Sequence, residues 1–141
     1  MKNVIAFICF FSFVFFAQSA ANAQRTATWK GGTPGKANEW NCPTNWKEGR
    51  VPDAFSDVII PDVATIGGFQ PVIRHPEEGV NSLTVLPGAQ LRIEASGALE
   101  VFESLELLAG DSILNYGQLN APLSENTGNT WNAALANYRR N

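Results

Sequence analysis

The sequence predicts an all-β fold, in the form of a short parallel β-solenoid, from three observations. Strand-like segments of three to five residues follow one another over 58–121. The turns between them contain glycine but lack the Asn-Gly or Asp-Gly pairs that tight antiparallel hairpins prefer. The segments that begin at Gly88 and Gly97 look like two copies of one unit, Gly-Ala followed by alternating apolar residues. An antiparallel β-sandwich stays open as the alternative, since its hairpins also turn at glycines.

Four apolar–polar–apolar triplets carry the strand prediction. They are Leu83-Thr84-Val85, Leu91-Arg92-Ile93, Leu99-Glu100-Val101 and Leu105-Glu106-Leu107. Because side chains alternate across a strand, each triplet should point two apolar groups inward and its middle residue outward. The triplets start eight, eight and six residues apart, a spacing typical of short strands that bend around a coil and stack on the previous coil.

Residues 1–23 are predicted to be a secretory signal peptide. Lys2 supplies a positive charge, an apolar run extends from Val4 to Phe16, and Ala21 and Ala23 are the small residues of a cleavage site before residue 24. The run has 13 residues, fewer than the roughly 20 that span a bilayer. We therefore expect export through the inner membrane and a secreted or cell-surface location, with no membrane contact after cleavage.

The composition of the predicted mature chain excludes several classes of function. Removing 1–23 leaves nine basic and thirteen acidic residues, a net charge of −4, which gives no reason to expect nucleic acid as a partner. Only Cys42 remains, so no internal disulfide is expected, and we interpret it as a structural thiol. No phosphate loop, zinc spacing or nucleotide fingerprint is present, and no cofactor is predicted.

The mature chain divides into three parts. A Trp-, Gly- and Pro-rich segment, 24–57, has no helical or strand period and is predicted to cap one end of the solenoid. Residues 58–121 form the predicted solenoid. In 122–141, Trp131, Leu135 and Tyr138 would share one face of a helix with Thr130 as its N-cap, so we expect a short C-terminal helix or a tail.

Seven short motifs occur in order along the chain. They are Thr28-Trp29-Lys30-Gly31-Gly32, Glu39-Trp40-Asn41, Asn45-Trp46, Gly49-Arg50-Val51-Pro52, Asp57-Val58-Ile59-Ile60-Pro61, Pro71-Val72-Ile73 and Asn81-Ser82-Leu83-Thr84-Val85. In this order they resemble the start of the β-helical, pectate-lyase-like repeats of large secreted and surface proteins of bacteria, and the resemblance covers roughly residues 27–107.

The resemblance implies a right-handed parallel β-helix at the cell surface or in the medium. It implies no single activity, because many proteins of this kind are adhesin-like or have no assigned function. Such proteins are often many hundreds of residues long, with further domains. A chain that stops at Asn141 is therefore expected to be a minimal stand-alone unit or a shortened copy.

Trp29, Trp40 and Trp46 are the candidate ligand-binding residues. An exposed indole face can stack on a sugar ring, which would make the chain a carbohydrate-binding module. The alternative is that all three indoles are buried in the cap, because an open solenoid end needs apolar cover.

Neither a catalytic constellation nor a metal site is predicted. Glu100 and Glu106 are the outward residues of their triplets, and a charged outer face is ordinary for a solenoid. A calcium site at Asp53, Asp57 and Asp62 was the weaker alternative to turn residues, since the spacing matches no calcium loop. The only histidine, His75, lies in a polar turn without a catalytic motif.

The sequence thus favours a non-catalytic secreted or surface module with a structural or adhesive role. Two alternatives stay open: a carbohydrate-binding module that uses exposed tryptophan, and a small polysaccharide lyase or hydrolase. The expected partners are a polysaccharide or another cell-surface component, and a second copy of the chain through the open solenoid ends.

Overall fold

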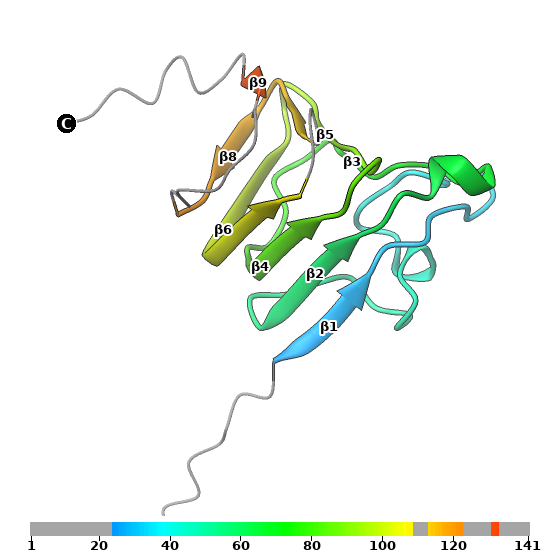
Figure 1. The fold of residues 1–141 in the computed structure, drawn as a ribbon, viewed down its shortest axis with the longest axis horizontal. Coiled ribbons are helices and arrows are strands. Elements are labelled where there is room, and N and C mark those ends of the chain that lie inside the picture. Colours follow the sequence, from blue (N-terminus) through cyan, green and yellow to red (C-terminus); the bar gives the residue numbers. More distant parts are fainter. Residues whose placement is uncertain (1–23, 109–112, 123–130, 133–141) are drawn as a thin grey trace, which may run out of the picture.

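Two parallel β-sheets make up most of the structure (Figure 1). The computed structural model describes residues 24–108, 113–122 and 131–132, so the signal peptide predicted for 1–23 lies outside the described residues. The larger sheet has the strand order β1 (Arg25–Thr28), β2 (Ser56–Ile60), β4 (Val80–Val85), β6 (Ala98–Leu107) and β8 (Gln118–Asn120). The smaller sheet has the order β3 (Val72–Ile73), β5 (Leu91–Ile93), β7 (Ile113–Asn115) and β9 (Trp131–Asn132).

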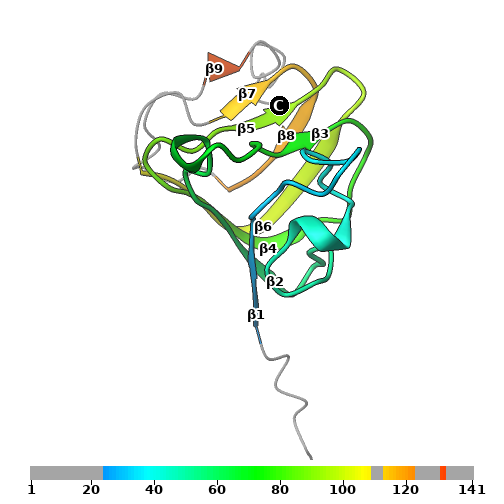
Figure 2. The same ribbon diagram turned by 90° about the vertical axis from the view of Figure 1, so that its right-hand side faces the viewer.

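Successive strands alternate between the two sheets from β2 to β9. Figure 2 shows β3, β5 and β7 of the smaller sheet on the opposite side of the molecule from β2, β4 and β6. Two short 3₁₀ helices, η1 (Pro43–Asn45) and η2 (Ala64–Ile66), lie in the connections. The described chain is therefore all-β, as the sequence predicts.

Every pair of strands in the described residues is parallel. This contradicts the antiparallel sandwich that the glycine turns left open. The physical reason lies in the connections: from β2 onward, each strand is followed by a strand of the other sheet, so the chain returns to the first sheet in the same direction.

The four triplets have the predicted orientation, with outer residues buried and middle residues turned outward. The last two triplets, however, belong to one ten-residue strand, β6, and are not separate strands. Its first part pairs with β8 and its second part with β4, with a register shift against Val80 and Ser82. The six-residue spacing of these triplets therefore reflects an irregular strand and not a turn.

The buried apolar side chains stack in register from strand to strand. In the larger sheet Val58, Leu83 and Leu105 are register partners, and all three are buried. In the smaller sheet Leu91 is the partner of Ile113 in the same way. Each such side chain contributes about 1.5–3 kcal/mol when it is fully removed from water, so these columns form the core of the fold.

Glycines allow the turns to stack as closely as the strands. A Cβ atom on Gly97 would lie 2.5 Å from the carbonyl oxygen of Ile73. The amide of Gln118 in turn donates to the carbonyl oxygen of Gly97 at 3.0 Å. The turns that the sequence marks by Gly97 and Gly117 therefore lie one above the other, with no room for a side chain between them.

Strand β1 lies in the segment for which the sequence showed no strand period. It pairs with β2 over four residues, and only Ala27 turns a fully buried side chain inward, which is too little for a visible alternation. Among the described residues, β1 is the edge strand of the larger sheet. The backbone of Thr28 is bound there by other groups: its carbonyl oxygen accepts from the Lys47 amide at 2.9 Å, and its amide donates to the Glu48 carboxylate at 2.8 Å.

The C-terminal helix prediction is wrong for the two residues of that region that are described. Trp131 and Asn132 form β9, which pairs with β7 in parallel. The rest of the predicted helix, up to Tyr138, lies outside the described residues. Within the described ranges, no helix is long and apolar enough to cross a membrane.

Candidate functional site

The three candidate tryptophans form one buried cluster. Trp29, Trp40 and Trp46 have exposed fractions of 0%, 1% and 0%. Trp46 meets both neighbours edge to face, with ring centroids 5.1 Å from Trp29 and 4.8 Å from Trp40. No indole face is therefore free to stack on a sugar ring, which contradicts the exposed-tryptophan site. The physical reason is the large apolar area of three indoles, which is stabilising only when it is removed from water.

The three indole N–H groups differ in their hydrogen bonds. Trp46 Nε1 donates to the carbonyl oxygen of Trp40 at 2.8 Å, and Trp29 Nε1 donates to that of Phe69 at 2.8 Å. Trp40 Nε1 is buried and has no partner in the described part of the chain. A buried donor without a partner costs about 1–3 kcal/mol, so Trp40 is the indole whose polar atom requires an explanation.

The buried amide of Asn45 holds the segment that carries Trp40. Its Nδ2 donates to the carbonyl oxygens of Lys36 at 2.6 Å and Glu39 at 2.9 Å, while its Oδ1 accepts from the amide of Thr33 at 3.0 Å. Asn45 itself is fully buried at the end of η1. Its three side-chain bonds fix the backbone immediately before Trp40.

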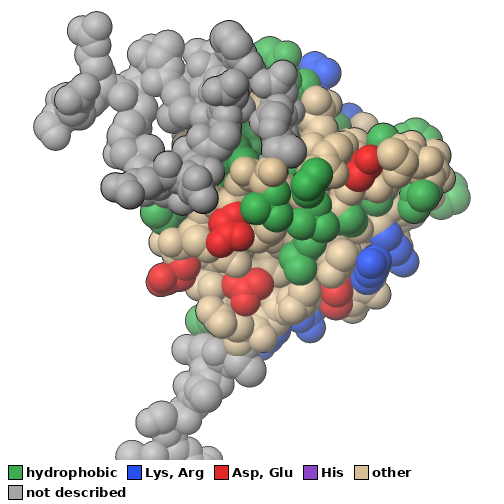
Figure 3. Space-filling view, in the orientation of Figure 1, with side chains coloured by type: hydrophobic (Ala, Val, Ile, Leu, Met, Phe, Trp, Pro, Cys, Tyr) green, Lys and Arg blue, Asp and Glu red, His purple; other side chains and the backbone are tan. Residues whose placement is uncertain are grey.

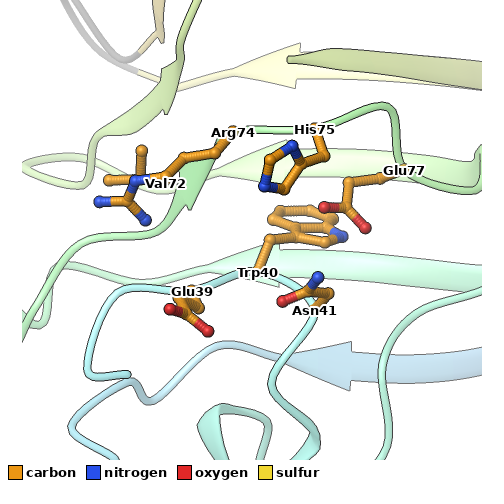
Figure 4. Close-up of a pocket in the computed structure, with 7 residues that line it drawn as sticks. All are labelled: Glu39, Trp40, Asn41, Val72, Arg74, His75 and Glu77. Atoms are coloured by element: carbon orange, nitrogen blue, oxygen red, sulfur yellow. The ribbon is translucent and has the colours of Figure 1, made fainter. Parts of the chain in front are cut away.

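A pocket of about 100 Å³ lies where this segment meets β3 and the loop that follows β3. Seven residues line it: Glu39, Trp40, Asn41, Val72, Arg74, His75 and Glu77. Figure 4 shows His75 and Glu77 on one side of the Trp40 indole and Glu39 and Asn41 on the other, with the Glu77 carboxylate on the side of the indole nitrogen. The Trp40 indole thus lines the pocket, and its buried N–H group lies on the side of Glu77.

Backbone hydrogen bonds join the two walls of the pocket. The amide of Val72 donates to the carbonyl oxygen of Asn38 at 2.8 Å, and the amide of Trp40 donates to that of Val72 at 3.4 Å. The loop after β3 is held from its other side, because the Glu77 amide donates to the carbonyl oxygen of Ala98 at 3.0 Å. Ser96 Oγ also donates to the carbonyl oxygen of Arg74 at 2.6 Å. The pocket is therefore built on the sheet framework.

The pocket carries both signs of charge. Burial raises the pKa of Glu77, and the nearby His75 opposes that shift. Arg74 lies with both terminal nitrogens 3.4 Å from Asn38 Oδ1. Two carboxyl groups, one guanidinium and one imidazole surround a small space, so a neutral group that can both donate and accept hydrogen bonds suits it best.

The aspartates of the calcium alternative are engaged separately. Asp53 accepts from Arg25 at 3.1 Å, Asp57 accepts from Ser82 at 2.7 Å, and Asp62 accepts from the amide of Ala64 at 3.0 Å. Within the described ranges, no three His, Cys, Asp or Glu side chains lie together in a way that could hold a metal ion. The structure thus contradicts a shared calcium site.

The remaining candidates lie outside the pocket, with one exception. Glu100, Glu103 and Glu106 are exposed along β6, and Figure 3 shows acidic side chains spaced apart on the face of the larger sheet. Cys42 is buried, with its sulfur 3.3 Å from Thr44 Oγ1. His75 is the exception: it is an exposed loop residue, as the sequence predicts, and it also lines the pocket.

Comparison of the chain with protein-family models, with curated proteins and with solved structures finds no match. The resemblance to β-helical, pectate-lyase-like repeats therefore rests on the sequence motifs alone.

The sequence predicted that Trp40 binds through an exposed indole face, and it did not indicate the polar residues that surround this side chain. Glu39 and Asn41 adjoin Trp40 in the chain, but Arg74 and Glu77 come more than 30 positions later. The link between the two segments is the parallel bridge between Glu39 and Val72, which no local pattern indicates. A polar turn directly after a short buried strand was the one available sign.

Proposed function

We propose that the two parallel sheets are faces of a short right-handed β-solenoid, closed at one end by residues 24–57. Three features support this fold. Strands alternate between the sheets along the chain, buried side chains such as Val58, Leu83 and Leu105 stack in register, and the turns at Gly97 and Gly117 stack in the same direction. These are the features of a chain that coils upon itself. The hand is the one that parallel crossovers adopt almost without exception.

On this fold we propose a non-catalytic, secreted or cell-surface module with an adhesive role. The observation that carries the proposal is the pocket at Trp40, where a rigid framework presents a buried N–H group without a partner. An unsatisfied donor beside other polar groups is suited to holding a ligand, and the cost of leaving it unpaired is recovered when an acceptor binds. The location rests on the predicted signal peptide.

The arrangement of acids supports binding over glycan cleavage. Glycoside hydrolysis needs two carboxyl groups that face each other across the scissile bond, about 5–9.5 Å apart. In the pocket, the two acids Glu39 and Glu77 lie on opposite sides of the Trp40 indole (Figure 4). The indole side chain lies between them in this view, so the two carboxyl groups do not face each other directly.

A polysaccharide or another surface component is the partner that we propose first. Addition of a second copy at β1 has less support, because Lys47 and Glu48 already bind the backbone of Thr28 at this edge. An edge strand with part of its outer backbone already occupied is a poorer template for a further strand.

The experiment is a binding and turnover assay with the full chain, expressed in an exporting host. Fluorescently labelled protein is applied to immobilised cell-wall and plant glycans and to intact bacterial cells, and released products are analysed in parallel. We expect saturable retention on at least one surface, lost after heat unfolding, and no product. Retention on no surface would refute the adhesive role, and reproducible release of glycan fragments would show that the protein is an enzyme.

A further inference from the structure

The polar groups, charges and volume of the pocket at Trp40 restrict the class of ligand, which the adhesive role alone does not specify. An indole N–H is a donor only, so whatever satisfies Trp40 Nε1 must present an acceptor. The atom is shielded from water in the described structure. The Glu77 carboxylate lies beside it in Figure 4. Binding of a ligand oxygen at Nε1 therefore requires a side-chain movement at this position, and Glu77 is the candidate.

The other polar groups of the pocket require a ligand that also donates. Glu39 and Glu77 offer carboxyl oxygens, which accept, and Asn41 offers an amide that does both. A ligand with acceptors alone would satisfy Trp40 and leave these oxygens without partners. Hydroxyl groups meet both demands, since each can donate and accept.

The balance of charge selects against ions. An anion would meet Glu39 and Glu77, and burial already disfavours negative charge at Glu77. A cation would meet the Arg74 guanidinium and could not accept from Trp40. A neutral ligand avoids both penalties.

The size of the pocket limits how much of the ligand it holds. Its volume of about 100 Å³ is smaller than the roughly 150 Å³ of a cavity that encloses a benzene ring. This accommodates a few atoms, such as two neighbouring hydroxyl groups at one edge of a sugar ring, with the rest of the ring outside.

We propose that this pocket binds one edge of a neutral saccharide residue, with Trp40 Nε1 donating to a sugar oxygen and Glu77 accepting from an adjacent hydroxyl group. The inference rests on the proposed adhesive function and adds to it the ligand class and the contacting atoms. The indole ring serves here through its N–H group, and not through the stacking face that the sequence suggested.

The test follows the indole N–H resonances of the full chain, labelled with ¹⁵N at its four tryptophans. Neutral methyl glycosides are titrated to concentrations on the order of 10 mM, where weak sites fill. We expect a saturable shift of the Trp40 resonance for at least one glycoside. The Trp29 resonance should stay in place, because its N–H is bound to Phe69.

Variants of Glu77 separate the hydrogen bond from the charge. Glu77→Ala removes the acceptor and should weaken binding at least tenfold, whereas Glu77→Gln keeps a carbonyl acceptor and should stay within a few-fold of the unmodified chain. Glu103→Ala, an exposed acid of β6, is the matched control and should change nothing.

Three outcomes would overturn the inference. If Glu77→Ala moves the Trp40 resonance of the free protein and no glycoside does, Glu77 itself satisfies the N–H group. If acetate or N-methylacetamide shifts the resonance and glycosides do not, the ligand class is wrong. If the protein adheres to glycan surfaces while the Trp40 resonance is unmoved, the adhesive function stands and the site lies elsewhere.

Discussion

The Nδ2 atom of Asn45 donates to the carbonyl oxygen of Glu39 at 2.9 Å, and this bond holds the residue next to Trp40. Because Asn45 is fully buried, its loss removes three buried hydrogen bonds and leaves the Thr33 amide without its partner. The carbonyl oxygens of Lys36 and Glu39 keep their bonds from the backbone amides of Glu39 and Cys42. We expect Asn45→Leu to lower the free energy of unfolding by about 2–4 kcal/mol. Urea denaturation followed by tryptophan fluorescence measures this.

Asn120→Ala is the control for that measurement. Asn120 is exposed and donates to Glu100 at 3.2 Å, so its replacement should change stability by less than about 0.5 kcal/mol. Equal effects of the two substitutions would show that Asn45 does not anchor the N-terminal segment.

The indole N–H bonds predict an order of stability among three equally buried tryptophans. Trp46→Phe and Trp29→Phe each remove a hydrogen bond to a backbone carbonyl, whereas Trp40→Phe removes a donor that has no partner. The first two should therefore be more destabilising than the third by about 1 kcal/mol or more. Urea unfolding of the three variants tests the order. A Trp40→Phe variant that is the least stable of the three would mean that its N–H group is bound in the native protein.

The edge of β1 predicts a dependence of stability on pH. Burial acts to raise the pKa of Glu48, but hydrogen bonds, chiefly from the Thr28 amide, outweigh it and lower the pKa below the ordinary 4.5. A lowered carboxyl pKa stabilises the fold above the unfolded value, and this contribution is lost as pH falls through the folded value. Relative to Glu48→Gln, the unmodified chain should lose stability on acidification. The side chain is exposed, so the change should be at most about 1 kcal/mol.

Glu77 provides the control of opposite sign. Burial raises the pKa of Glu77, so the protonated carboxyl group stabilises the folded state relative to the ionised one. This contribution to stability is lost as pH rises through the pKa of the folded state. Relative to the unmodified chain, Glu77→Gln should therefore gain stability as pH rises. Unfolding curves between about pH 3 and pH 7 measure both variants. Parallel curves for Glu48→Gln and Glu77→Gln would contradict the assignment.

The strand register predicts a specific cross-link. Ser82 of β4 and Ser104 of β6 are direct partners on the outer face of the larger sheet. Parallel neighbours lie about 4.8 Å apart, within reach of a disulfide. A Ser82→Cys, Ser104→Cys double variant should form an intramolecular disulfide on mild oxidation, seen as a shift in non-reducing electrophoresis and by mass spectrometry. The pair Ser82→Cys, Glu100→Cys is out of register and should not. Equal cross-linking of both pairs would refute the register.

Local patterns in the sequence predicted the parts of the fold that depend on neighbouring residues. The alternation in Leu91-Arg92-Ile93 correctly indicated which side chains are buried, and Gly97 correctly marked a turn. Strand β1 was missed because only Ala27 faces the core, and β9 was expected to be helical because Trp131 fits a helical period equally well. Short segments do not carry enough residues to distinguish one period from another.

The sequence by itself determined that this chain buries an alternating set of apolar residues in an all-β fold. The reason is that a strand buried on one face has apolar residues at every second position. The sequence favoured parallel strands, but only the tertiary structure excluded the antiparallel alternative. It also showed that the three tryptophans are buried and that Trp40 lines one pocket with His75 and Glu77. That arrangement depends on the bond between Asn38 and Val72, which lie 34 positions apart in the chain. Such contacts follow from the packing of the whole core, and no local pattern of residues specifies them.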